Sequence, residues 1–450
     1  MQKEPIFEYF KIFKLHNEKN ISLEMDNFAK ILVSDNGSGK TTLLNCMYYI
    51  LDKSFDKLAE IDFEKIELKF STGVELTLEK SQVIENNYIP KFKDSYTQRI
   101  FSNISRTRLI KLVKLASSTS YFKFSQTMKE NYFIDGINHS IRETYEALNR
   151  LERTGFVDSL EDSIYEDWSR IVDKNVNLKV LYLPTYRRIE QDISNIDNID
   201  YVSNNGLINF GMKDVKNRFD KISSDLKDSA VRLYTSLNGK VLTHLTFDYK
   251  ANKEQYDIIS NTQILKIVLG RVGDNISSDT KDRIISLVES GNIKDARYHP
   301  LVFVLSNLVE VYYAQKEQDD SIKEFVLTVN KYLSNKKFIY DESSVEITII
   351  NLSTNKEVSL EKLSSGEKQL VSIFSRLYLE DNNTTYAVLF DEPELSLSIE
   401  WQATLLPDIV NSHRCGFLIA ATHSPFIFNN ELDSIADNLC VDYDIEENDG

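Results

Sequence analysis

The chain has 450 residues, of which 42% are hydrophobic, enough to bury a large core and to build about two to three structural units. Its formal net charge of −16 argues against a protein that coats nucleic acid non-specifically, because that affinity comes mainly from neutralising phosphates. No apolar run has membrane-spanning length, and the first residues lack a signal-peptide core. The three cysteines form no C-x-x-C pair, which argues against a zinc site. We therefore expect a cytoplasmic protein without a membrane partner, and binding of nucleic acid to a local basic patch stays open.

Strands predicted at residues 6–15, 21–25 and 28–33 precede a glycine-rich loop. The loop glycines let the backbone turn back so that its N–H groups point at a polyphosphate, and the following helix directs its positive end at the same charge. Lys40 can reach the β and γ phosphates, and the Thr41 hydroxyl can ligate Mg²⁺. Ser34 stands where the usual pattern begins with glycine, so a turn that binds nothing is the alternative. The predicted ATP-binding residues here are Asn36, Gly37, Ser38, Gly39, Lys40, Thr41 and Thr42.

Two further apolar runs end in residues that suit phosphate chemistry. The run 386–390 reads as a buried parallel strand and ends at Asp391 and Glu392. We predict that Asp391 holds Mg²⁺ and that Glu392 polarises the attacking water as a general base; a surface turn is the alternative. The run 417–421 ends near His423, which is placed to contact the γ-phosphate or serves only a structural role.

The remaining elements alternate between strands and helices. Residues 66–70 and 74–79 predict a hairpin, and Phe13 either stacks on adenine or belongs to the core. After the strand predicted at 178–183, Arg187 and Arg188 could meet phosphate or pair with surface acids. Gln191 could sense Mg²⁺ and the attacking water, as a glutamine does in ABC-type heads.

Residues 141–151 have a helical period, and a basic run begins the same region. This run is either a solvated face or a contact surface for an acidic partner. It consists of Lys91, Lys93, Arg99, Arg106, Arg108, Lys111 and Lys114, opposed by Asp94.

Two apolar stripes predict helices that pack antiparallel in a short stalk. The first contains Val215, Phe219, Ile222, Leu226 and Leu233, and the second contains Ile322, Phe325, Val326, Val329, Tyr332 and Leu333. Strands predicted at 338–341 and 345–352 follow, and the acidic tail 431–450 is expected to cap the head or fray.

These motifs carry a resemblance to a known family. The chain resembles the ABC-type ATPases of the overcoming-lysogenization-defect lineage in the segments 36–41, Leu363-Ser364-Ser365-Gly366-Glu367-Lys368-Gln369, 389–397 with Glu400-Trp401-Gln402, and 421–425. The resemblance implies that Ser364, Ser365 and Gly366 bind ATP held by a second copy, so that two ATP molecules lie between two heads. Ser365 replaces a glycine common in transporters, and Ser398 stands where many relatives have histidine.

The expected fold class is α/β, an ABC-type P-loop ATPase head with a mixed sheet flanked by helices, an antiparallel β subdomain and helical or short coiled-coil insertions. The predicted segments are a head N-terminal lobe (1–90), a helical insertion (91–172), a return to the head (173–209), a helical stalk (210–336) and a head C-terminal lobe (337–450).

The lineage's nuclease domain of the TOPRIM type is not expected here, since only 27 residues follow His423. The chain resembles the single-headed AriA ATPases of the PARIS anti-phage systems, more than it resembles the PtuA ATPases of Septu. This resemblance implies a homo-oligomer of ATP-sandwich dimers, with a hexamer as one candidate. It would hold a separate nuclease subunit inactive until a phage trigger protein, such as an acidic DNA mimic, is sensed. The alternative is a DNA-repair ATPase of the RecF kind, acting as an ATP-dependent DNA clamp.

Overall fold

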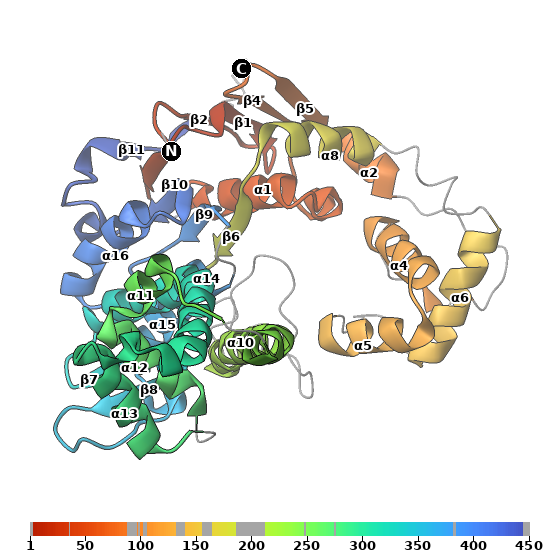
Figure 1. Cartoon of the computed structure of the whole chain (residues 1–450). Helices are drawn as coiled ribbons and strands as arrows, with labels where there is room; N and C mark the ends of the chain where they lie inside the picture. The colour runs from red at the N-terminus through yellow and green to blue at the C-terminus, as the bar shows by residue number, and fades with distance from the viewer. Residues whose placement is uncertain are drawn as a thin grey trace, which may run out of the picture. The chain divides into compact units, whose positions relative to one another are not determined.

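The computed structural model describes residues 3–35, 37–87, 97, 100–101, 106–131, 140–154, 164–185, 212–246, 249–273, 276–380 and 384–443 (Figure 1). The chain divides into two compact units: residues 1–209 together with 384–450, and residues 210–383. The segment 363–369 therefore falls in the second unit, whereas the sequence analysis assigned it to the C-terminal lobe of the head. The five predicted segment boundaries stay predictions.

The first unit contains a parallel sheet in the order β11-β3-β10-β9-β6. Every residue of β9 is buried, which explains its apolar run without alternation. The strands predicted for this sheet are confirmed to within about two residues, the usual uncertainty of a boundary. The sheet consists of β3 (Ala29–Val33), β6 (Lys179–Leu183), β9 (Tyr386–Asp391), β10 (Cys415–Thr422) and β11 (Ala436–Asn438).

A second, antiparallel sheet in the same unit has the order β12-β2-β1-β4-β5. Its strands β4 and β5 bury every second side chain, so the predicted hairpin is confirmed, with Gly73 at φ +84° in the turn. Part of the acidic tail completes this sheet as its edge strand β12. The strands are β1 (Phe7–Leu15), β2 (Lys19–Glu24), β4 (Lys65–Phe70), β5 (Glu75–Glu79) and β12 (Cys440–Tyr443).

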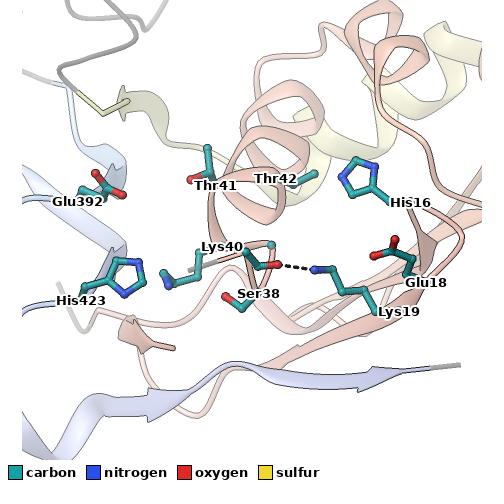
Figure 2. A pocket seen from close by; sticks show the side chains of 11 residues that line it. His16, Glu18, Lys19, Ser38, Lys40, Thr41, Thr42, Glu392 and His423 are labelled. Carbon is teal, nitrogen blue, oxygen red and sulfur yellow. Dashed lines mark hydrogen bonds between the residues drawn. The ribbon is translucent and has the colours of Figure 1, made fainter. Parts of the chain in front are cut away.

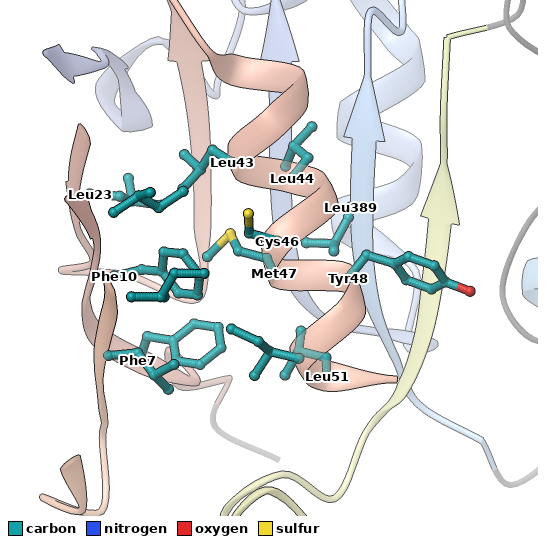
Figure 3. Close-up of a cluster of buried hydrophobic side chains, with 14 of the residues drawn as sticks. Phe7, Phe10, Leu23, Leu43, Leu44, Cys46, Met47, Tyr48, Leu51 and Leu389 are labelled. Carbon is teal, nitrogen blue, oxygen red and sulfur yellow. The ribbon is translucent and has the colours of Figure 1, made fainter. Parts of the chain in front are cut away.

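Helix α1 (Lys40–Leu51) lies between the two sheets, as Figure 3 shows. Its residues Leu43 and Met47 are fully buried and belong to one core cluster with Phe10 of β1 and Leu389 of β9. Burying each such side chain contributes about 1.5–3 kcal/mol to the stability of the folded state. The core therefore fixes the beginning of α1, where the glycine-rich loop ends, relative to both sheets.

The other helices of the first unit form two groups. Helix α8 joins the main core through Tyr165, Trp168 and Val172, although the sequence analysis grouped it with the insertion. Helices α4, α5 and α6 share a separate apolar cluster, so the predicted helical character of this region is confirmed. The bounds are η1 (Phe55–Glu60), α2 (Lys80–Asn87), α4 (Arg106–Ser118), α5 (Tyr121–Asn131), α6 (Ile141–Arg153), α8 (Ile164–Asn175), α16 (Ile399–Asn411), η6 (Pro425–Ile427) and η7 (Asp433–Ile435).

The basic run at the start of this region is largely outside what the structure describes. Lys91, Lys93 and Arg99 lie outside the described residues, as do the side chains of the three basic residues at 106, 108 and 111. Lys114 is exposed on α4. The two interpretations of the run therefore both stay open.

The second unit is mostly helical. The strands predicted at 338–341 and 345–352 are confirmed as β7 and β8, and they pair antiparallel. Its elements are α10 (Met212–Thr246), α11 (Lys253–Ile259), α12 (Thr262–Arg271), α13 (Ser278–Glu289), η3 (Asn292–Lys294), η4 (Ala296–Tyr298), α14 (His299–Asn330), β7 (Lys336–Asp341), β8 (Glu346–Asn351), η5 (Leu360–Lys362) and α15 (Ser365–Leu379).

The two predicted apolar stripes meet between α10 and α14. The ring centroids of Phe219 and Phe325 are 5.5 Å apart, and Gln315 Nε2 donates to the carbonyl oxygen of Leu226 at 2.8 Å. A later position on α10 thus meets an earlier position on α14, so the predicted antiparallel packing is confirmed. The side chain of Leu233 lies outside the described residues. Over the part of the chain that the structure describes, no helix is long and apolar enough to span a bilayer.

Candidate ATP site

The glycine-rich loop joins β3 to α1 and has the backbone that its glycines predict. Gly39 adopts φ +102° as the N-cap of α1, and a Cβ built there would lie 2.5 Å from Ile21 Cδ1. Gly37 adopts φ +82°. Both values favour glycine, and at Gly39 the space requires it as well. Asn36, a predicted phosphate ligand, lies outside the described residues.

Lys40 is buried within this loop and is 5% exposed. Its Nζ donates to the carbonyl oxygens of Ser34 and, at 3.1 Å, of Asp35. Burial lowers the pKa of Lys40, while the nearby carboxylates of Asp391 and Glu392 favour the charged form. A buried ammonium that bonds mainly to carbonyl oxygens is well suited to exchange them for phosphate oxygens.

The hydroxyl of Thr41 and the carboxylate of Asp391 meet at the end of β9. Thr41 Oγ1 donates to Asp391 Oδ2 at 2.9 Å, and Thr185 Oγ1 donates to the same oxygen at 2.7 Å. Asp391 is only 1% exposed. This set of a carboxylate and hydroxyl oxygens fits Mg²⁺, which binds proteins through one or two carboxylates and completes its shell with water and phosphate oxygens.

Glu392 follows in a sharp turn with φ +51°, and its N–H donates to the carbonyl oxygen of Ala421 at 2.8 Å. Burial raises the pKa of Glu392, and the negative charges of Asp391 and Glu394 raise it further, against the effects of His423 and Lys40. A carboxylate with a raised pKa is a stronger base, which suits proton transfer near neutral pH.

One pocket of about 520 Å³ brings most of the predicted residues together. Figure 2 shows Glu392 and His423 at one end, Lys40 and Ser38 between, and His16, Glu18 and Lys19 at the other end. The pocket is lined by His16, Glu18, Lys19, Gly37, Ser38, Gly39, Lys40, Thr41, Thr42, Glu392 and His423.

Four residues at this site were missed by sequence reasoning. His16 and Glu18 belong to the turn between β1 and β2, Lys19 is the first residue of β2, and Thr185 follows β6. The glycine-rich loop lies against this turn because of how the strands pair in the sheets, and no local sequence motif predicts that pairing. Phe13 does not line the pocket; Lys65 Nζ lies over its ring, 4.4 Å from the centroid.

The signature segment begins helix α15 in the second unit. Ser364 caps the helix: its Oγ accepts from the Glu367 N–H at 3.3 Å, and Glu367 Oε2 accepts from the Ser364 N–H at 2.7 Å. Ser364 and Ser365 are exposed, whereas Gly366 is buried. Burial alone would raise the pKa of Glu367, but its hydrogen bonds with Lys336 and Ser364 lower it. Arg187, Arg188 and Gln191 lie outside the described residues.

A glycine-rich loop between a buried parallel strand and a helix, with a carboxylate bonded to the first helical hydroxyl, defines the class of P-loop nucleotide-binding proteins. The model of the AAA ATPase domain family matches residues 11–428, and the chain belongs to this family. It is therefore an ATPase that binds and hydrolyses ATP.

The chain is also similar to individual proteins. It is 23% identical over 444 residues to the "Retron Vc95 probable ATPase" of Vibrio cholerae serotype O1 biovar El Tor, covering 94% of this chain and 70% of the relative. Among solved structures, it resembles the Smc head domain of Pyrococcus furiosus bound to the C-terminal domain of ScpA, with TM-score 0.38, 11% identity and coverage of 97% and 96%. The Smc head with coiled coil and joint of Pyrococcus yayanosii gives TM-score 0.31, 12% identity and coverage of 97% of both chains. TM-scores this low do not establish a common fold.

Proposed function

We propose that the residues of this pocket divide the work of ATP hydrolysis. Lys40 and the backbone of residues 37–42 bind the phosphates, and Thr41 with Asp391 holds Mg²⁺. The observation that carries this assignment is the 2.9 Å hydrogen bond between Thr41 Oγ1 and Asp391 Oδ2, which joins residues 350 positions apart. When bound, Mg²⁺ supplies positive charge that offsets the charge of the β and γ phosphates.

Glu392 accepts the proton of the attacking water in this proposal, and His423 contacts the γ-phosphate. Both side chains line the same end of the pocket (Figure 2). Ser364, Ser365 and Gly366 close on the ATP of a second copy, which the exposure of the two serines at the start of α15 permits. The complete site would then need two chains.

At the level of the cell, we propose an ATPase scaffold and sensor in anti-phage defence. It oligomerises through ATP-bound dimers and holds a separately encoded nuclease of the TOPRIM type inactive until a phage protein is sensed, as in the AriA ATPases of PARIS. The similarity to a retron ATPase along 94% of the chain supports a place among ATPases of such systems. The largely helical second unit offers long surfaces for partners.

The test is mass photometry of the purified chain with ATP, for the wild type and Glu392→Gln, alone and co-expressed with the product of the adjacent gene. A closed oligomer that retains the neighbouring protein is the expected result. A dimer that forms only with ATP, ignores the neighbour and binds DNA with a steep dependence on salt would instead support the RecF-like clamp.

A further inference from the structure

Glu394 connects the ends of strands β9 and β10, which Glu392 and His423 directly follow. Thr422 Oγ1 donates to Glu394 Oε2 at 2.8 Å, and the His423 N–H donates to Glu394 Oε1 at 2.8 Å. Both carboxylate oxygens of Glu394 are therefore bonded to the segment that positions His423. Hydrogen bonds to a charged carboxylate are stronger than those between neutral groups, so these two bonds hold the segment of His423 strongly.

The link extends into a small network around the same turn. The Ser424 N–H donates to Thr422 Oγ1 at 3.0 Å, and Ser424 Oγ donates to Gln402 Oε1 at 2.7 Å. Gln402 Nε2 in turn donates to the carbonyl oxygen of Leu397 at 3.0 Å. The turn after β9, the segment after β10 and helix α16 are thus joined by side chains that do not themselves line the pocket.

The backbone at Glu392 needs such support. A non-glycine residue at φ +51° is strained and keeps this conformation only when its surroundings hold it. The Glu392 N–H bonds to Ala421 just before the Thr422 hydroxyl that bonds Glu394. Glu394 therefore fastens the same two segments a second time, a few residues from the strained position.

We propose that Glu394 is a positioning residue for ATP hydrolysis, and that its carboxylate holds the His423 segment and the Glu392 turn in one fixed relation at the γ-phosphate end of the pocket. This inference rests on the roles proposed above for Glu392 and His423. Misplacement of a catalytic group by about 1 Å can cost about 100-fold in rate, so loss of the link should lower kcat more than it weakens ATP binding.

The experiment separates the geometric part from the charge. Glu394→Gln keeps the size of the side chain and can still accept a hydrogen bond from the His423 N–H, so we expect it to retain a kcat within about threefold of wild type. Glu394→Ala removes link and charge, and we expect kcat to fall about tenfold or more with little change in the KM for ATP. Glu75→Gln, an exposed change on the outer strand β5, is the matched control and should alter neither quantity.

Glu392→Gln makes the two possible failures distinguishable. If Glu392→Gln abolishes hydrolysis while Glu394→Ala keeps the wild-type kcat, or Glu394→Gln loses as much kcat as Glu394→Ala, the inference about Glu394 is wrong and the proposed function stands. If Glu392→Gln hydrolyses ATP normally, the proposed role of Glu392 and the inference about Glu394 are both wrong. Should Glu394→Ala not bind a fluorescent ATP analogue, Thr422→Val replaces it. This variant removes one of the two bonds to Glu394, and an unchanged kcat there overturns the inference.

Discussion

Lys19 Nζ donates a hydrogen bond to the carbonyl oxygen of Gly37, which ties the first residue of β2 to the glycine-rich loop. Lys19 is only 6% exposed, and its Cε would lie 3.8 Å from a Cβ built at Gly39. A P-loop binds phosphate through N–H groups, so its carbonyl oxygens must be satisfied elsewhere. Lys19 donates this hydrogen bond to the Gly37 carbonyl from strand β2, which is not part of the P-loop sequence motif.

We expect Lys19→Met to weaken ATP binding about tenfold, because the Gly37 carbonyl then loses a charged donor, and a hydrogen bond to a charged group is worth about 1.5–3 kcal/mol. Titration with a fluorescent ATP analogue measures this change. Lys19→Arg keeps the charge and should bind more tightly than Lys19→Met. Equal affinities for the wild type and Lys19→Met would show that the loop holds its shape without this bond.

Gly39→Ala should abolish measurable ATP binding, since the new methyl group would lie 2.5 Å from Ile21 Cδ1 and 3.2 Å from Leu15 Cδ2 at an unfavourable φ of +102°. Gly73→Ala is the matched control. It also has a positive φ, of +84°, but nothing lies within 4 Å of the added Cβ. It should cost about 1–2 kcal/mol of stability and leave ATP affinity unchanged. Isothermal titration calorimetry measures the ATP affinity of both variants. Wild-type affinity in Gly39→Ala would contradict this prediction.

Thr41→Val tests the proposed magnesium site, because valine keeps the shape of threonine and loses the hydroxyl bonded to Asp391. We expect the Mg²⁺ concentration that half-saturates ATP hydrolysis to rise by about tenfold or more. Thr41→Ser retains the hydroxyl and should stay near the wild type. An unchanged Mg²⁺ dependence in Thr41→Val would exclude this hydroxyl from the metal site.

A buried ion pair in the second unit makes a stability prediction. Both Asp319 carboxylate oxygens accept from Arg271 Nη2 at 2.7 Å, and the side chains are 0% and 5% exposed. Asp319→Ala leaves the guanidinium buried without this partner, and we expect a loss of about 3–5 kcal/mol. Hydrogen exchange of the α14 amides reads the stability of this unit directly.

The matched control is Arg297→Gln, which breaks the exposed pair with Asp295, where the side chains are 69% and 50% exposed. Such pairs contribute about 0–1 kcal/mol. Similar exchange rates for the wild type and Asp319→Ala would contradict the assigned strength of the buried pair.

The strands and most residues at the ATP site were predictable because each has a local signature. The run before Asp391 is continuously apolar because β9 is buried on both faces, and Gly37 and Gly39 mark a loop that only glycine can form. The stripes on α10 and α14 predicted that the two helices pack together because the apolar period of 3.6 residues gives each helix one apolar face. The contacts of Phe219 with Phe325 and of Leu226 with Gln315 then show the antiparallel direction.

The sequence by itself determined the family, the phosphate loop, the acidic strand end and the types of the main elements, since each depends on neighbours along the chain. Only the tertiary structure decided that Lys19 supports Gly37, that Thr185 joins Thr41 on Asp391, and that Glu394 holds the segment of His423. Residues distant in sequence become partners through the order of strands in two sheets. That order is set by burial of the whole core, which no short pattern encodes.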